Sequence, residues 1–283
     1  MSISTSALLV ELNIGTWTAR KLDKKVSEEV DAQKATKVKA GNYRKNILAG
    51  AKELEDITKL AGNVRNWHYE QTLPWSDSGI RLLPLGNFMN YRTELDAKMQ
   101  EFETLKRNFV TQYPNLISQM AFQLGTLFDR NDYPSVDEVD RKFYFALNFY
   151  PMPESGDFRV EVEEELKKEL QDKYQSHYDK KLNEAMAEAW GRLHTTLKHL
   201  SERLETEADG KAKVFRDATI SNAVELCSLL TSLNVTKDPK LEAARRELER
   251  AIVNVEPKEL RESVLVRQDV KAQVDEILSK FDF

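Results

Sequence analysis

The chain has 283 residues, of which 41% are hydrophobic and 31% charged, with a formal net charge of −5 and one cysteine. This composition is slightly less apolar and more charged than that of an average globular protein, which favours long helices with wide solvated faces. A single cysteine excludes an intrachain disulfide and a cysteine-ligated zinc cluster. The negative net charge gives no general attraction to nucleic acid or anionic membranes.

The opening residues, 1–13, lack the basic region of a secretory signal, and Glu11 interrupts their short apolar run. No stretch approaches about 18 apolar residues, so the sequence predicts no transmembrane helix. We therefore expect a cytoplasmic protein. Cys227 lies in an apolar helical stretch, where we expect a buried, unreactive thiol.

In chain order, the first predicted element is a strand over residues 7–17, because apolar and polar side chains alternate there. Residues 26–70 predict one or two helices, since glycines interrupt the pattern. The segment 73–86 contains two prolines and two glycines, which predicts a structured turn or loop.

A helix is expected over residues 87–113. Pro114 either kinks this helix or begins another over residues 115–128. Residues 129–159 are the least helical part of the chain. Within them, Ser135 and Glu138 have the spacing of a capping box and predict the start of a short helix.

The first strand needs a partner, because a lone strand is unstable in water. The alternating segment Phe158–Val162 is the best candidate. The aromatic segment Phe143–Tyr150 is the other candidate, although it could also end the short helix.

The longest pattern runs from Val160 to Gly210, where apolar residues recur every three or four positions and predict one helix of about fifty residues. Such a helix would be about 75 Å long. Its early spacings are all four, which favours a bundle helix over a regular coiled coil. Three further helices are expected over residues 211–233, 239–254 and 257–280.

These elements predict a mainly α fold, an elongated long-helix bundle with a small β element. We expect a single domain over residues 1–283, with a small β/loop subdomain formed by 7–17, 73–86 and 129–162.

No sequence motif points to catalysis. The glycines are dispersed, so no phosphate-binding glycine loop is present. The histidines lack the Glu-x-x-His spacing of a di-iron bundle, and we expect them to be solvated or to cap helices. They are His68, His177, His194 and His199. A run of five acidic residues lacks the order of a calcium loop and is interpreted as helix caps and a solvated face. It consists of Asp129, Asp132, Asp137, Glu138 and Asp140.

The sequence therefore predicts no cofactor, no metal and no enzymatic activity. Residue spacing alone leaves a Ser/His/Asp site open.

Charge is distributed unevenly. Residues 20–52 contain ten Lys or Arg and four Asp or Glu, a net charge of +6. Residues 129–172 contain six Lys or Arg and thirteen Asp or Glu, a net charge of −7. The asymmetry fits either two solvated faces or electrostatic complementarity, within the fold or between copies. Nucleic-acid binding is a weaker alternative, because Tyr43 is the one aromatic residue of the basic segment and single-strand binders use several. The candidate electrostatic contact residues are Arg20, Lys21, Lys24, Lys25, Lys34, Lys37, Lys39, Arg44 and Lys45.

The segment from Pro74 to Pro84 contains residue types that anchor protein interfaces. We expect Trp75, Arg81, Leu82 and Leu83 to form an interaction surface. The alternative is that Trp75 and Leu82 plug one end of the helical bundle.

Several segments together resemble a family of proteins of unknown function from phages and bacterial mobile elements. They are Trp17–Arg20, Pro74–Trp75 with Gly79–Pro84, Asp132–Ser135, Met152–Pro153 with Asp157–Val160, and Phe215–Asp217 with Asn222, Glu225–Cys227, Leu233–Asn234 and Asp238–Pro239. The likeness covers nearly the whole chain. Genes of this family often lie beside a MoxR-type AAA+ ATPase, which implies such a protein partner and no activity.

We therefore expect a non-enzymatic helical scaffold or adaptor of a phage or mobile element. It would act in the host cytoplasm through assembly with itself or with an AAA+ ATPase. One alternative is a nucleic-acid-binding accessory protein of phage metabolism. Another is a membrane-acting helical bundle that inserts Phe143–Tyr150, although Arg141, Lys142 and Asn148 make this segment poorly suited to a membrane.

Overall fold

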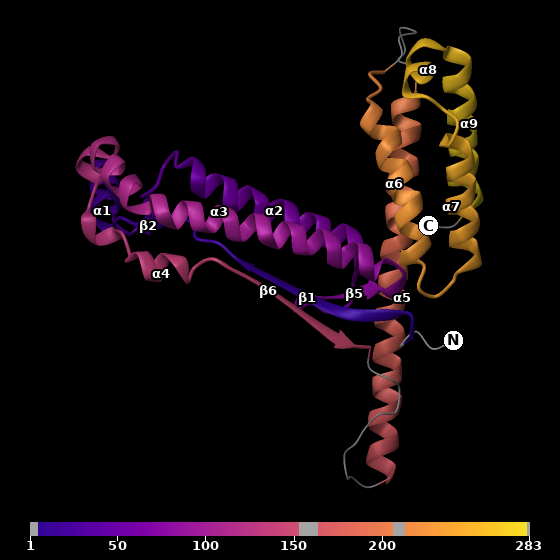
Figure 1. Cartoon of the computed structure of the whole chain (residues 1–283), viewed down its shortest axis with the longest axis horizontal. Helices are drawn as coiled ribbons and strands as arrows, with labels where there is room; N and C mark the ends of the chain where they lie inside the picture. Colours follow the sequence, from indigo (N-terminus) through magenta and orange to yellow (C-terminus); the bar gives the residue numbers. More distant parts are fainter. Residues whose placement is uncertain (1–4, 153–163, 206–212, 282–283) are drawn as a thin grey trace. The chain divides into compact units, whose positions relative to one another are not determined.

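The computed structural model describes residues 5–152, 164–205 and 213–281. In these ranges the chain is mainly α-helical with a small antiparallel sheet, as the sequence predicts (Figure 1). It divides into two compact units, each built from separate stretches of sequence. The larger unit comprises Met1–Glu11, Tyr69–Tyr91 and Asn148–Phe283, and the smaller unit comprises Leu12–His68 and Arg92–Leu147.

The larger unit is built around a helical bundle. Its helices are α5 (Glu164–Leu204), α6 (Asp217–Leu233), α7 (Pro239–Ile252), α8 (Pro257–Glu262) and α9 (Val264–Lys280). Helix α5 packs on α6, α7 and α9, and its buried stripe includes Leu193, Leu197 and Leu200. This recurrence every three or four residues places the leucines on one face of the helix, where they exclude water.

The long predicted helix is confirmed over Glu164–Leu204, and the remaining positions 160–163 and 206–210 lie outside the described residues. Its apolar stripe is buried only toward the C-terminal end. Leu166 is 46% exposed, whereas Leu204 is buried.

The last helix predicted from the sequence, over residues 257–280, is two helices. Ser263 separates α8 from α9, and its hydroxyl accepts a hydrogen bond from the Val266 amide at 3.3 Å, which caps α9. Pro239 and Pro257 lie in the first turns of α7 and α8, where the missing proline N–H leaves no hydrogen bond unmade.

Arg267 of α9 joins the helix ends of the larger unit. Its guanidinium is buried and donates to four backbone carbonyls: Leu204 at 3.0 Å, Leu260 at 3.1 Å, Arg203 at 2.5 Å and Lys213 at 2.8 Å. Three of these carbonyls belong to the last turns of α5 and α8, which carry partial negative charge and lack intrahelical donors. Burial lowers the pKa of Arg267.

One sheet has the strand order β4-β5-β1-β6, and β5 pairs antiparallel with both β4 and β1. Its strands are β1 (Ala7–Gly15), β4 (Leu73–Pro74), β5 (Ile80–Pro84) and β6 (Tyr144–Pro151). The predicted first strand is confirmed, and the aromatic segment is its partner β6. The alternative partner Phe158–Val162 lies outside the described residues.

The prediction that residues 73–86 form a loop is wrong, because they contain β4 and β5. Leu82 and Leu83 are both fully buried, although neighbouring side chains of a strand point to opposite faces. Both faces of β5 are therefore covered, and a strand covered on both faces shows no polar alternation. Gly79, the residue before β5, has a φ of 95°, a backbone conformation that favours glycine.

The smaller unit contains four elements in full: β2 (Arg20–Leu22), α1 (Lys24–Gln33), β3 (Arg44–Asn46) and α4 (Val136–Asp140). Helices α2 (Lys52–Gln71) and α3 (Phe88–Gln123) contribute most of their length to it. Its core is aromatic, with the Phe109 and Phe143 rings 5.3 Å apart and edge to face. Short 3₁₀ turns occupy Leu85–Asn87, Gly125–Leu127 and Arg130–Asp132.

The structure of residues 26–70 and of the helix at Pro114 is more specific than the sequence predicts. Residues 26–70 hold two helices separated by the strand β3, and Gly50, with a φ of 75°, lies between β3 and α2. Helix α3 continues through Pro114 to Gln123, so Pro114 does not begin a new helix. The capping box is confirmed: the Ser135 amide donates to Glu138 at 2.8 Å and the Glu138 amide donates to Ser135 at 3.3 Å.

Candidate functional site

Eight of the nine predicted electrostatic contact residues are exposed, on β2, α1, β3 and the connection between α1 and β3. We call them the basic surface: Arg20, Lys21, Lys24, Lys25, Lys34, Lys37, Lys39 and Arg44. None of the eight has an ion-pair partner within the part of the chain that the structure describes. Their charges therefore face solvent beside the exposed Glu28 and Glu29 of α1, and the surface keeps a net positive charge.

Hydrogen bonds hold the backbone that carries this surface. Asp23 caps α1 by accepting from the Val26 amide at 3.1 Å. The Ser27 hydroxyl accepts from the Tyr43 amide at 2.9 Å, which ties the end of the connection to α1. Asp31 accepts from the Ala40 amide at 3.4 Å. The connection that presents Lys37 and Lys39 thus returns onto α1.

Lys45, the ninth predicted contact residue, lies inside the smaller unit and is only 7% exposed, so its assignment to an exposed contact is wrong. Its ammonium lies 3.1 Å from the Asp23 carboxylate and 2.7 Å from the Asp132 carboxylate, and it donates to the Leu127 carbonyl at 2.8 Å. Burial alone would lower the pKa of Lys45, but the hydrogen bonds to Asp132 and Asp23 outweigh it and raise the pKa. The Val26 amide and Lys45 lower the pKa of Asp23.

Replacing Lys45 by methionine is expected to lower the free energy of unfolding at pH 7 by about 3 kcal/mol, because two carboxylates lose their shared cation. The raised pKa of Lys45 makes its contribution complete below about 10.5 and lost as pH rises further. The lowered pKa of Asp23 makes its contribution complete above about 3.8 and lost in acid.

Urea unfolding at pH 3, 7 and 10 measures this effect. The difference between wild type and Lys45→Met should be similar at pH 7 and pH 10 and smaller at pH 3. Lys25→Met, on the neighbouring basic surface, is the matched control and should stay within about 0.5 kcal/mol of wild type. A difference that is independent of pH would contradict the ion-pair assignment.

The second predicted site, Trp75 with Arg81, Leu82 and Leu83, is packed within the larger unit. Leu82 lies in its core, and Leu83 is also fully buried, which leaves neither side chain any surface for a partner. Trp75 is partly buried, with its ring 5.4 Å from that of Tyr178 and edge to face. The structure therefore favours the packing alternative for Trp75 and Leu82.

Arg81, like Trp75, makes contacts within the larger unit. It donates to the Thr72 hydroxyl at 2.7 Å and to the Thr72 carbonyl at 3.1 Å, and its guanidinium lies 4.8 Å from the Tyr69 ring centroid. Arg192 of α5 donates to the same Thr72 carbonyl at 2.9 Å and to the Tyr69 carbonyl at 2.8 Å. Burial and the nearby Arg192 lower the pKa of Arg81. The two arginines satisfy the carbonyls at the end of α2.

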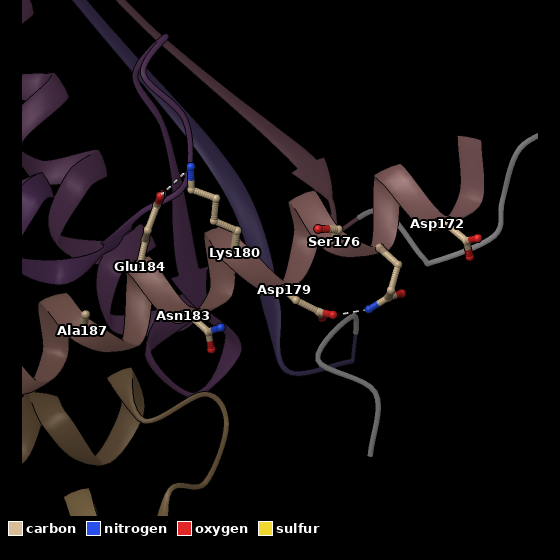
Figure 2. A pocket seen from close by; sticks show the side chains of 8 residues that line it. Asp172, Ser176, Asp179, Lys180, Asn183, Glu184 and Ala187 are labelled. Carbon is tan, nitrogen blue, oxygen red and sulfur yellow. Dashed lines mark hydrogen bonds and ion pairs between the residues drawn. The ribbon is translucent and has the colours of Figure 1, made fainter. Parts of the chain in front are cut away.

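One hollow of the described residues lies along one face of α5 (Figure 2). It encloses about 800 Å³, and all its lining residues, from Asp172 to Ala187, come from this one helix. Several of them pair with each other: Gln175 donates to Asp179 at 2.8 Å, and Lys180 lies 3.9 Å from Glu184. A single polar helix face offers no converging groups from a second element, so it does not resemble a binding pocket.

No group of three or more His, Cys, Asp or Glu suited to a metal occurs within the described ranges. The predicted acidic run has structural contacts: Asp129 caps a 3₁₀ turn, Asp132 pairs with Lys45, Glu138 completes the capping box, and Asp140 lies 3.1 Å from Lys106. Among the histidines, His68 is buried in the last turn of α2 and not solvated.

Ser201 is the serine that comes closest to a nucleophile arrangement. Its hydroxyl donates to Asp275 at 2.5 Å, and the Lys271 ammonium lies 3.4 Å from it and 2.5 Å from Asp275. Burial alone would raise the pKa of Asp275, but the bonds from Lys271 and Ser201 outweigh it and lower the pKa. The three groups join α5 to α9, and the buried hydroxyl serves this interhelical contact.

Cys227 is buried, as predicted, and burial raises its pKa to about 11. A thiol with so high a pKa has little thiolate at neutral pH and is a poor nucleophile. Among the helices in the described ranges, none combines the length and the apolar character needed to cross a lipid bilayer.

Comparisons of the chain with protein-family models, with curated proteins and with solved structures found no match.

Proposed function

We propose that the protein is a non-enzymatic adaptor whose basic surface binds an acidic surface of a protein partner. The observation that supports this proposal is the set of eight exposed, unpaired cations in a chain of net charge −5. Local charge of one sign attracts a partner of opposite sign and accelerates its association. The rigid attachment of the Lys37 and Lys39 segment to α1 reduces the entropy lost on binding.

An acidic protein fits this surface better than a nucleic acid does. The exposed large hydrophobic residues of the basic surface are Leu22, Val30, Val38 and Tyr43. Of these, only Tyr43 offers a ring for base stacking. The resemblance described above implies a MoxR-type AAA+ ATPase as partner, and we propose such an ATPase as the first candidate. Self-association through an acidic surface of a second copy is the alternative within the same proposal.

Reversing four charges of the basic surface tests this proposal. In the variant Lys24→Glu, Lys25→Glu, Lys37→Glu and Lys39→Glu, the affinity for the partner ATPase should fall at least about 30-fold, roughly 2 kcal/mol. Biolayer interferometry at 50 and 300 mM NaCl measures the dissociation constant, and wild-type binding should weaken with salt because exposed charges are screened.

The matched control reverses four exposed cations elsewhere on the smaller unit: Lys52→Glu, Lys59→Glu, Arg107→Glu and Lys142→Glu. It changes the net charge equally and should keep the affinity within about three-fold of wild type, which is under 1 kcal/mol. Equal losses in both variants would sink the proposal. Sedimentation of the protein alone distinguishes self-association from binding to a different protein. If a single-stranded oligonucleotide binds tightly and the basic-surface variant weakens that binding, the nucleic-acid alternative is established instead.

A further inference from the structure

A second hollow lies in the larger unit between α5 and the start of α6, which are neighbouring helices (Figure 1). We call it the α5–α6 groove. It encloses about 540 Å³, a size typical of small-molecule sites. Thr195, His199 and Arg203 line it from α5, at spacings of four that place them on one helix face. Arg216, Thr219 and Asn222 line it from the facing side.

The groove is rich in hydrogen-bond donors. None of its lining residues in the described ranges is Asp or Glu. The guanidinium groups of Arg203 and Arg216 have no ion-pair or hydrogen-bond partner within the described parts of the chain. Two neighbouring carboxylates are already paired, Glu205 with Lys213 at 2.7 Å and Asp217 with Arg261. The two arginines therefore give the groove a positive charge that no carboxylate of the described residues neutralises.

We propose that the α5–α6 groove binds a small molecule that carries a phosphate or pyrophosphate group. Two guanidinium groups and several neutral donors offer more hydrogen bonds than the two oxygens of a carboxylate can accept, whereas a phosphate group presents three acceptor oxygens. The amide groups at the start of α6 add to this preference, because a helix N-terminus attracts anions. Val214 and Ala218, which are exposed, provide apolar contact for the rest of the ligand.

Isothermal titration of the full chain with pyrophosphate, at constant ionic strength, tests this site. Wild type should bind one equivalent saturably. Arg203→Gln and Arg216→Gln should each weaken binding at least about ten-fold, equal to about 1.4 kcal/mol. Both arginines are exposed and unpartnered, so melting temperatures without ligand should stay close to wild type.

Two controls keep the test specific. Lys198→Gln removes an exposed cation of α5 that does not line the groove, and the four-fold reversal of the basic surface removes charge from the smaller unit. Both should keep the dissociation constant within about three-fold of wild type, less than 1 kcal/mol. Absence of saturable binding, or equal weakening by Lys198→Gln, would overturn the site. Binding of an oligoglutamate peptide with the same arginine dependence, without binding of pyrophosphate, would overturn the proposed ligand class.

Discussion

Replacing Arg267 by alanine is expected to lower the free energy of unfolding by about 3–4 kcal/mol. Four backbone carbonyls share this one guanidinium, and the substitution leaves them without their donor inside the larger unit. The cost arises mainly from these buried acceptors and from the space left by a large buried side chain. The described partners of Arg267 are carbonyls and the Phe215 ring, none of which is charged, so the loss should not depend on salt.

Urea unfolding followed by circular dichroism measures this loss. Arg267→Lys keeps the charge but not the planar set of five donors, so its loss should lie between those of wild type and Arg267→Ala. Arg250→Ala serves as the control, because Arg250 contacts only the Arg246 carbonyl on its own helix. If Arg267→Ala unfolds at the same urea concentration as wild type, the helix-end network contributes nothing to stability.

Leu82→Asp and Leu83→Asp should each cost at least about 4 kcal/mol and unfold much of the protein at 37 °C. These neighbouring residues lie on opposite faces of β5 and both are fully buried, so either aspartate places a charge in an apolar environment.

Thermal unfolding of both variants measures the effect, with Ser78→Asp in the preceding exposed turn as control. If one of the two aspartate variants melts like wild type, one face of β5 is open to solvent. That result would restore a contact surface at this strand.

The parts of the fold that the sequence predicted correctly are those with strong local signals. The alternation of β1, the leucine periodicity of α5 and the Ser135 capping box are each contained within a few turns or one strand. The sequence leaves open whether Pro114 kinks helix α3 or begins a new helix, because proline usually interrupts a helix. Packing of residues on both sides of Pro114 keeps this helix continuous. The strand β5 was missed because burial on both faces removes the alternation that identifies a strand.

The predicted site residues include both buried and exposed cations, because local sequence does not show long-range contacts. Nine cations between Arg20 and Lys45 look equivalent in sequence, but Lys45 alone among them meets Asp132, which lies far along the chain. Only long-range contacts distinguish this buried ammonium from the exposed ones. The α5–α6 groove was missed because Arg203 and Arg216 lie on different elements and belong to no motif. Their juxtaposition follows from the return of the chain after α5.

The division of the chain into two units has a consequence for dissecting this protein. The boundary is crossed four times, between Glu11 and Leu12, His68 and Tyr69, Tyr91 and Arg92, and Leu147 and Asn148. Every crossing falls within β1, α2, α3 or β6, and none falls in a linker. No single cut separates the units, and no continuous fragment consists of one unit alone. Cutting the chain at one point therefore cannot yield the two units separately, and each four-fold charge-reversal variant must be built in the intact protein.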